Sequence, residues 1–445
     1  GLKALNRHSD IHEIKIFKKV GDSVLVPPSG FESIGWIVTH GQSHYQAQQN
    51  LEEIVEGISI TVTPYEPISS IGQTKRKNPF SAASVIREHI LRSSKIERLR
   101  YLPTKPLPKL KVGVLCNIYG GDSEVENDLT KVGNSIKKTL EGRGHKVTFF
   151  DMNEDPLPII KLMRADVDIV FNVCERINDS SYLEPHGASL LDILQIPYTG
   201  SNPQTLALCI DKIRVKKLLD YHSIPTPKWD YAFSTEDEID SSLRYPLMVK
   251  PASTDNSIGI TNDSVVTTPE QLRQQIERCL KLAPAALIEE YIEGDEYDVT
   301  IIGNDDEAIV LPLSRSTFDD LPKNIWHIYP YDAKWHENSV YDLIKVERPA
   351  LVPAKLAKII SEIALDTYNI LDCHDYGRVE IRVDKEGNPF VLELNPNPSI
   401  DENDCVPASA ELIGQNYGDF LEEVISYAIQ RYRNSPPYAH LQASF

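Results

Sequence analysis

The sequence predicts an α/β protein, and two patterns support this class. From Lys111 onward, short apolar strands alternate with helical segments, beginning with a strand at 112–115 and a helix that ends near Arg143. This alternation is typical of βαβ units in a parallel sheet. Residues 376–399 read YGRVEIRVDKEGNPFVLELNPNPS, in which two segments of alternating polarity flank turn formers at 384–388. That pattern predicts a β-hairpin.

Residues 1–64 are interpreted as a small β-rich unit that precedes the main fold. Its expected strands are residues 11–17, 24–26, 34–39 and 58–62. Residues 43–57 have helical spacing and begin with a serine, which is a favourable N-cap. Residues 65–108 read as a linker with a basic helix at 82–102, and three prolines in its last six residues mark a domain boundary.

The rest of the chain divides into three segments that mix strands and helices. We expect residues 109–208 to form the parallel sheet, residues 209–320 a central subdomain, and residues 321–445 a C-terminal subdomain that contains the hairpin. Further strands are expected at 146–150, 168–173, 247–250 and 286–290, and helices at 353–368 and from Tyr417. A chain of 445 residues is long enough for this organisation.

The composition narrows the range of partners. The net charge is 46 − 65 = −19, which argues against a nucleic-acid backbone or an anionic membrane as the main partner. No apolar stretch approaches the ~18 residues of a membrane-spanning helix, and no signal-peptide pattern opens the chain. The six cysteines lack CxxC spacing, which favours reduced thiols in a cytoplasmic protein over a zinc site.

The predicted hairpin carries the most informative side chains. If its strands pair symmetrically about the turn at 386–387, Glu380 lies opposite Glu393 and Arg378 lies opposite Asn395. Two carboxylates placed directly across a ladder repel each other, so we expect a cation between them. Carboxylates and an amide oxygen suit Mg²⁺ that is held together with substrate phosphates.

The alternative is a surface hairpin with solvated charges. Pro396 and Pro398 favour the site, because two prolines directly after a strand end it and fix the backbone.

Lys250 ends a predicted strand, and the small polar loop 253–259 follows it. Backbone amides and hydroxyls in such a loop can bind phosphates. The alternative is an ordinary strand-end lysine, and Asp255 supports that alternative because a carboxylate repels phosphate.

Two further stretches allow two readings each. Residues 288–296 are a strand that runs into an acidic turn, which is either solvated or the edge of an adenosine site. Residues 331–335 form a loop with aromatic residues and one lysine, which is either a lid or a packing loop. His186 is interpreted as a turn residue, and no convincing Ser/His/Asp or Cys/His arrangement is present.

Taken in order, several segments resemble the ATP-grasp superfamily and, within it, the D-alanine–D-alanine ligase branch. They are residues 196–201, 211–212, 249–251, 288–290, 331–335, 377–380 and 392–395. The resemblance covers about residues 109–431. It implies an ATP-grasp fold of three α/β subdomains, with ATP bound between the central and C-terminal ones.

The resemblance also implies roles by matched position. Nucleotide contacts would come from Lys212, Lys250, Asn256, Ser257, Glu289, Glu290, Ile292 and Glu296. Lys334 would close over phosphate, and Arg378 would steady the negative oxygen that develops in acyl transfer. Two Mg²⁺ ions, or Mn²⁺ in their place, would be held by Glu380, Glu393 and Asn395.

The implied activity is ATP-dependent joining of a carboxylate to an amine, through an acyl phosphate, on an amino acid or a specialised metabolite. The substrate residues depart from the family. The family has a glutamate near the first glycine turn, and in this chain Glu124 or Glu126 would take its place. The Ser-Leu pair that holds the acceptor's carboxylate falls, by counting, at Asp404 and Cys405, and an aspartate there would repel a carboxylate. We therefore expect an acceptor other than D-alanine.

Alternative readings remain open at this point. The chain could be an authentic D-alanine–D-alanine ligase, or a catalytically silent nucleotide-binding scaffold. Residues 1–64 are similar to the closing lobe of another ATP-grasp module, which would imply an upstream module in a tandem ligase. An ordinary small accessory domain is the other possibility for this unit. The family resemblance also favours a homodimer.

Overall fold

The computed structural model describes residues 8–22, 24, 33–62, 95–96, 98–119, 124–155, 157–254, 257–335 and 339–434. The side chains of residues 124–128 and of Trp335 lie outside the description. The chain falls into two compact units, residues 1–80 and 81–445. None of the helices in the described part of the chain has both the length and the apolar character that crossing a bilayer requires.

The first unit has a two-stranded sheet and one helix. Strand β1 (Ile11–Ile16) pairs antiparallel with β2 (Gly35–Thr39), and α2 (His44–Glu56) follows. Ser43 caps α2 by accepting a hydrogen bond from the backbone N–H of Gln46, as its sequence predicts.

The predicted strand at 58–62 is wrong. This segment joins no ladder among the described residues, because the backbone N–H of Ile58 bonds to the carbonyl of Val55 and closes the helix end. Most of the predicted strand at 24–26, residues 65–81 of the linker and most of the helix at 82–102 lie outside the described residues. Residues 95–96 and 98–100 are helical.

The second unit begins with a three-stranded parallel sheet in the order β4-β3-β5, which confirms the predicted parallel arrangement. Its strands are β3 (Lys111–Cys116), β4 (Lys146–Asp151) and β5 (Ile169–Asn172). Helices α4 (Glu124–Gly142) and α13 (Tyr417–Asn434) pack together beside it. Strand β3 is buried along nearly all its length, which suits its continuous apolar sequence. Further helices are α5 (Ile159–Met163), α6 (Glu184–Ile193) and α7 (Pro203–Ile210).

A four-stranded antiparallel sheet comes next, in the order β6-β9-β7-β8. Its strands are β6 (Trp229–Ala232), β7 (Leu247–Pro251), β8 (Val265–Val266) and β9 (Ala286–Glu290). Helix α8 (Lys212–Tyr221) precedes it, and α9 (Pro269–Leu280) packs on β7. Thr268 caps α9 and Pro269 starts it, a favourable combination of N-terminal residues.

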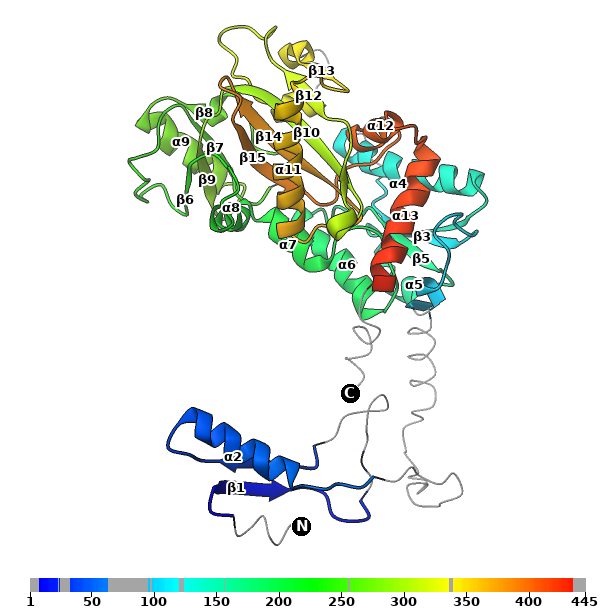
Figure 1. Cartoon of the computed structure of the whole chain (residues 1–445). Helices are drawn as coiled ribbons and strands as arrows, with labels where there is room; N and C mark the ends of the chain where they lie inside the picture. The colour runs from blue at the N-terminus through cyan, green and yellow to red at the C-terminus, as the bar shows by residue number, and fades with distance from the viewer. Residues whose placement is uncertain are drawn as a thin grey trace. The chain divides into compact units, whose positions relative to one another are not determined.

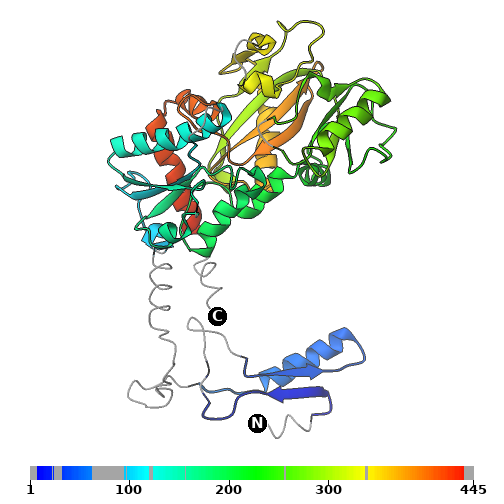
Figure 2. The ribbon, with the colours of Figure 1, turned by 180° about the vertical axis from the view of Figure 1, so that it is seen from behind.

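The largest sheet has the order β13-β12-β10-β14-β15, with β11 also paired to β10. Its strands are β10 (Gly294–Ile302), β11 (Ile309–Val310), β12 (Ser314–Thr317), β13 (Lys345–Glu347), β14 (Tyr376–Asp384) and β15 (Pro389–Asn395). Helix α11 (Ala354–Ile370) crosses one face of it (Figure 1), and Figure 2 shows the sheet from behind. Short 3₁₀ turns lie at Ser181–Leu183, Asn262–Ser264, Asp305–Glu307 and Val340–Leu343.

The two faces of this sheet have opposite character. Val299, Val379 and Leu394 belong to the core cluster that also contains Ile360 and Tyr368 of α11. Because side chains alternate along a strand, the polar residues between them point to the other face. The sheet therefore keeps one face for its core and presents charged groups on the face that lies away from α11.

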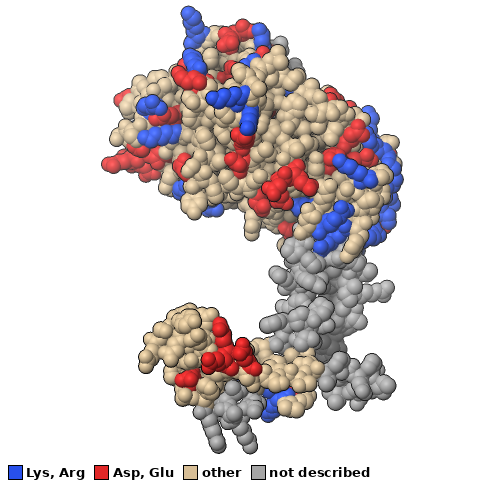
Figure 3. Space-filling view, viewed as in Figure 1, with Lys and Arg blue, Asp and Glu red and all other residues tan. Residues whose placement is uncertain are grey.

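Two short helices lie near this polar face. Residues 331–335, predicted as a loop, form helix α10 (Tyr331–Trp335), and α12 (Cys405–Glu411) starts after Asp404. Residues 331–335 are helical for a local reason. Pro330 starts the turn, and its carbonyl accepts a hydrogen bond from the N–H of Ala333. On the visible face of this unit, positive and negative side chains are interspersed (Figure 3).

Candidate active site

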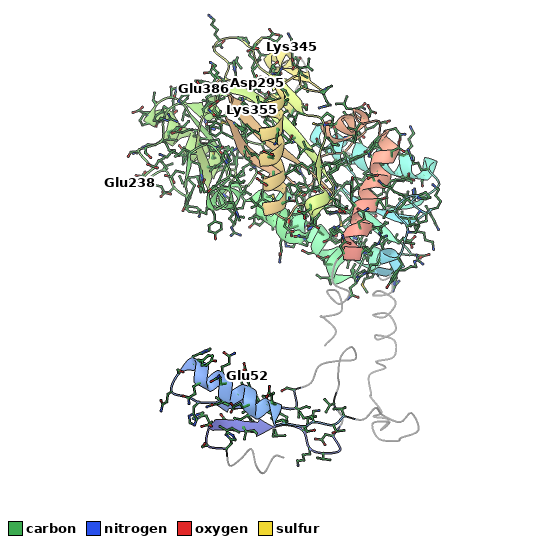
Figure 4. All side chains as sticks on the ribbon, in the orientation of Figure 1. Glu52, Glu238, Asp295, Lys345, Lys355 and Glu386 are labelled. Atoms are coloured by element: carbon green, nitrogen blue, oxygen red, sulfur yellow. The ribbon has the colours of Figure 1, made fainter. Side chains whose placement is uncertain are left out.

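The strand register aligns four polar residues across the largest sheet. Asp298 of β10 is paired with Ser314 of β12 on one side and with Glu380 of β14 on the other. Glu380 is in turn paired with Glu393 of β15. We call Ser314, Asp298, Glu380 and Glu393 the site row. Glu386, labelled in Figure 4, marks the hairpin turn from which β14 and β15 can be followed.

The predicted pairing of the hairpin is confirmed. Glu380 lies opposite Glu393, and Arg378 lies opposite Asn395. The ladder also contains a bulge that the sequence did not indicate, because Ile381 pairs with Val391 and leaves Leu392 without a partner. Leu392 and Glu393 consequently line the same cavity although they are adjacent in sequence.

Buried lysines surround the carboxylates at one end of the row. Lys212 Nζ, from the first turn of α8, lies 3.3 Å from Glu393 and donates to the carbonyl of Thr254. Glu289 of β9 lies between Lys250 Nζ at 2.8 Å and Lys216 Nζ at 2.5 Å. The lysine ammonium groups thus reach the site already paired with carboxylates of this chain.

The two facing carboxylates have opposite pKa shifts. Burial, together with the negative charge of Glu393, raises the pKa of Glu380 to about 7. Burial would also raise the pKa of Glu393, but Lys212, Lys250 and Lys334 more than offset it and lower this pKa to about 2. Glu393 therefore keeps its negative charge, whereas Glu380 holds its charge poorly unless further positive charge is supplied.

Arg378 lies beside this pair. Its Nη2 donates to Glu380 at 2.7 Å, and its Nε lies 3.2 Å from Asp298. The next arginine on the strand, Arg382, is bound to Glu296 at 2.7 Å. The guanidinium of Arg378 is thus fixed at the middle of the site row.

Two adjoining cavities open on the polar face. The first is lined by residues that include Lys212, Lys250, Glu289, Ile292, Leu392 and Glu393. The second has a volume of about 380 Å³ and is lined by residues that include Asp298, Arg348, Arg378, Asn395, Asp404 and Cys405. Glu296, Tyr329, Lys334 and Glu380 line both cavities. A reactant in one cavity can therefore meet a reactant in the other beside Glu380.

The donor set at the hairpin suits magnesium. Among the described residues, no group of three or more His, Cys, Asp or Glu side chains is placed to hold a metal ion. The hairpin offers two carboxylates, Glu380 and Glu393, and the amide oxygen of Asn395. Mg²⁺ is usually bound through one or two carboxylates plus substrate phosphates and water, so this set fits an ion shared with a phosphate ligand.

Comparison with known proteins decides the family. The family model described as D-ala D-ala ligase C-terminus matches residues 217–426. A D-alanine–D-alanine ligase of Cupriavidus pinatubonensis is 30% identical over 321 residues, which cover 72% of this chain and 91% of that protein. The chain belongs to the D-alanine–D-alanine ligase family. It is an ATP-dependent carboxylate–amine ligase of the ATP-grasp type, as the sequence predicted.

Solved structures share the fold of this ligase. The D-alanine–D-alanine ligase of Bacillus anthracis, complexed with ATP, gives a TM-score of 0.59 at 25% identity and covers 73% of this chain and 99% of its own. The VanG D-Ala:D-Ser ligase of Enterococcus faecalis gives 0.58 at 21% identity, with coverage of 72% and 100%. A different model, L-amino acid ligase C-terminal domain 2, matches residues 1–63.

The structure of this ligase brings most of the predicted site residues together. Those that line one or both cavities are Lys212, Lys250, Ser257, Glu289, Glu290, Ile292, Glu296, Lys334, Arg378, Glu380, Glu393, Asn395, Asp404 and Cys405. Asn256 lies outside the described residues. Glu124 and Glu126 belong to helix α4, but their side chains lie outside the description.

Some predicted nucleotide residues already have protein partners. Glu290 is bound to Arg244 at 2.8 Å, and Glu296 is bound to Arg382. Ser257 donates to the carbonyl of Tyr329 at 3.2 Å, and the backbone N–H of Tyr331 donates to Ile260. The loop after β7 therefore contacts the segment that leads into α10, which carries the exposed Lys334.

Sequence reasoning missed three charged residues of this site. Asp298 is two positions after Glu296 on one strand, and Lys216 is four positions after Lys212 on one helix, so their spacing was a usable signal. Arg348 carried no such signal. It lies just beyond the edge strand β13, and its position depends on how that strand pairs with β12.

Proposed function

We propose that this ligase joins the carboxylate of an amino acid or a small specialised metabolite to the amine of a second amino acid that is not D-alanine. The observation that carries the proposal is Asp404, a carboxylate in the second cavity at the position where the family uses a serine. The mechanism proceeds through an acyl phosphate, and its products are an amide, ADP and inorganic phosphate.

In the first step, an oxygen of the donor carboxylate attacks the γ-phosphorus of ATP, and the bond to ADP breaks. The protein's task is to position the reactants and to balance charge. Lys212, Lys250 and Lys334 supply positive charge around the first cavity. Glu380, Glu393 and Asn395 would hold magnesium, which when bound neutralises phosphate charge.

In the second step, the acceptor amine attacks the acyl carbon and phosphate leaves. Negative charge develops on the carbonyl oxygen during this attack. Arg378, fixed between Asp298 and Glu380, is the cation best placed to stabilise that oxygen.

The acceptor's chemistry follows from Asp404. Its carboxylate accepts hydrogen bonds from Ser399 Oγ and from the backbone N–H of Asp401, and it lines the second cavity. A ligand carboxylate beside it would be repelled, whereas an amine or a hydroxyl would be favoured. The match of residues 1–63 to an L-amino acid ligase domain favours L-amino acids as substrates.

The test is a screen of amino-acid pairs, in both stereochemical forms, for ADP formation and for the mass of the product. We expect a pair other than D-alanine with D-alanine to give the fastest turnover. If D-alanine with D-alanine is the best pair, the protein is an authentic D-alanine–D-alanine ligase and the proposal is wrong. If no pair exceeds the rate of the Glu393→Gln variant, the proposal is also wrong.

A further inference from the structure

Arg348 is a charged group of the second cavity to which the proposed mechanism gives no task. It lines that cavity, yet its buried Nε has no hydrogen-bond partner among the described residues. Its Nη2 makes one long hydrogen bond, 3.4 Å, to Ser314 Oγ. A buried guanidinium N–H without a partner is unfavourable, so a ligand acceptor at this position would be stabilising.

The neighbouring arginines differ from Arg348 in their ion pairs, although the buried Nε of Arg378 also has no hydrogen-bond partner among the described residues. Arg378, Arg382 and Arg315 each form an ion pair with a carboxylate of the chain. No carboxylate within the described ranges forms an ion pair with Arg348. Its charge is therefore available to a bound anion, whereas the other three charges are already balanced.

The position of Arg348 indicates which part of a substrate it would meet. Ser314, its hydrogen-bond partner, ends the site row on the side opposite to Glu393. In the proposed mechanism, phosphoryl transfer takes place at the Glu393 end of the site row, and acyl transfer takes place beside Arg378 in the middle of the row. An acceptor whose amine points to the middle extends its remaining groups toward Arg348 and Asp404.

We infer that Arg348 binds the α-carboxylate of the acceptor amino acid, while the Asp404 carboxylate accepts a hydrogen bond from the side chain of that acceptor. This inference rests on the proposed function and narrows it to acceptors with a free carboxylate and a donor-bearing side chain. In the family, a serine at the position of Asp404 contacts the acceptor's carboxylate. Arg348 provides that contact in this chain.

The activity test compares each acceptor that the screen finds with its α-carboxamide. Wild-type protein should prefer the free acid by about tenfold or more in kcat/KM, because a charge-assisted hydrogen bond is lost in the amide. Arg348→Gln should bring this ratio close to one by raising the KM for the acid, without changing the KM for ATP. Arg348→Lys should restore part of the preference, since it keeps the charge but not the planar fork.

Arg315→Gln is the matched control. It removes an arginine from the adjacent strand, but one whose charge is paired with Glu347. Its ratio of acid to amide should equal that of wild type. An unchanged ratio in Arg348→Gln, or equal use of acid and amide by wild type, would overturn the inference.

A binding measurement separates this inference from the proposed function. Thermal denaturation of the full chain with ADP and Mg²⁺ is followed with each of the common L-amino acids, and then with the corresponding amides. Stabilisation by acids that is absent for amides and lost in Arg348→Gln supports the inference even if no turnover is found. Turnover with unchanged discrimination in Arg348→Gln overturns the inference and leaves the proposed function intact.

Discussion

The two ends of the site row are organised differently. At the Glu393 end, the chain supplies both signs of charge, with Lys212 on Glu393 and with Lys250 and Lys216 on Glu289. At the other end, Arg348 faces the second cavity without an ion-pair partner among the described residues. One end is preorganised by the protein's own ion pairs, and the other leaves its charge for a ligand. We propose that the chemistry common to the family takes place at the first end and that the second end determines substrate choice.

The largest expected effect concerns the Glu393 end. Glu393→Gln keeps the size of the side chain but removes the charge that faces Glu380 and the lysines, so turnover should fall about a hundredfold or more. Glu386→Gln, at the exposed hairpin tip, is the control and should leave turnover unchanged. ADP release and the melting temperature are measured together. A wild-type rate in a folded Glu393→Gln variant would remove this residue from the active site.

The second prediction tests whether the Glu393 end is held by its own ion pairs. Glu289→Gln leaves two buried lysines without their shared carboxylate and should destabilise the protein by about 3 kcal/mol, seen as a lower melting temperature. Glu290→Gln changes the adjacent glutamate, whose partner Arg244 is exposed, and should lower stability by less than about 1 kcal/mol. Equal losses in the two variants would contradict preorganisation by the Glu289 pairs.

The third prediction follows the same cluster with pH. Burial lowers the pKa of Lys216 to about 8 from 10.5, although Glu289 opposes the shift. Between these values the unfolded chain binds the proton and the folded chain does not, so folded stability rises with pH. The difference in unfolding free energy between wild type and Lys216→Met should therefore move in favour of wild type, by up to about 1.4 kcal/mol per pH unit.

Chemical denaturation at pH 7, 8, 9 and 10 measures this difference. Lys217→Met, at an exposed position of the same helix, is the control. A difference that does not change with pH would show that Lys216 keeps its proton throughout.

The fourth prediction concerns the second cavity. Asp404→Ser should improve the use of D-alanine as acceptor about tenfold, because it removes like-charge repulsion. Asp404→Asn removes the charge but keeps an oxygen for the hydrogen bonds from Ser399 and Asp401. Comparing it with Asp404→Ser therefore separates the effect of the charge at residue 404 from the effect of the side chain's shape. Competition between D-alanine and the best acceptor of the screen gives the readout. If neither variant changes acceptor choice, Asp404 does not set it.

The smallest expected effect comes from an ion pair outside both ends. Lys385 lies 2.9 Å from Glu293, with both side chains largely exposed. Solvent screens such pairs, so Lys385→Ala should lower stability by less than about 0.5 kcal/mol. Double-mutant analysis with Glu293→Ala measures the coupling. A larger coupling would mean that the buried pairs owe less to burial than we suppose.

The sequence predicted the hairpin well because its pairing is set by local features. The alternation of polar residues and the turn at 386–387 were enough to place Glu380 opposite Glu393. Order and spacing of motifs were enough for the family. Local patterns did not reveal the bulge at Leu392, since the bulge depends on how β15 meets β14 and the core.

The wrong predictions and the missed site residue Arg348 share a physical cause. The segment 58–62 has strand composition, but a strand needs a partner, and the described part of the first unit offers none. Residues 331–335 looked like a loop, yet one helical turn forms after Pro330. Arg348 acquires its place only through the pairing of β12 with β13. Each depends on contacts between segments that no single stretch of sequence contains.

The length of the site row suggests the length of an inhibitor that spans both of its ends. Neighbouring strands lie about 4.8 Å apart, so three strand spacings separate Glu393 from Ser314 by about 14 Å. A single molecule that joins a phosphate mimic to a carboxylate through a linker of this reach would occupy both cavities at once. Shortening the linker by one strand spacing would force it to release one of its two anchors.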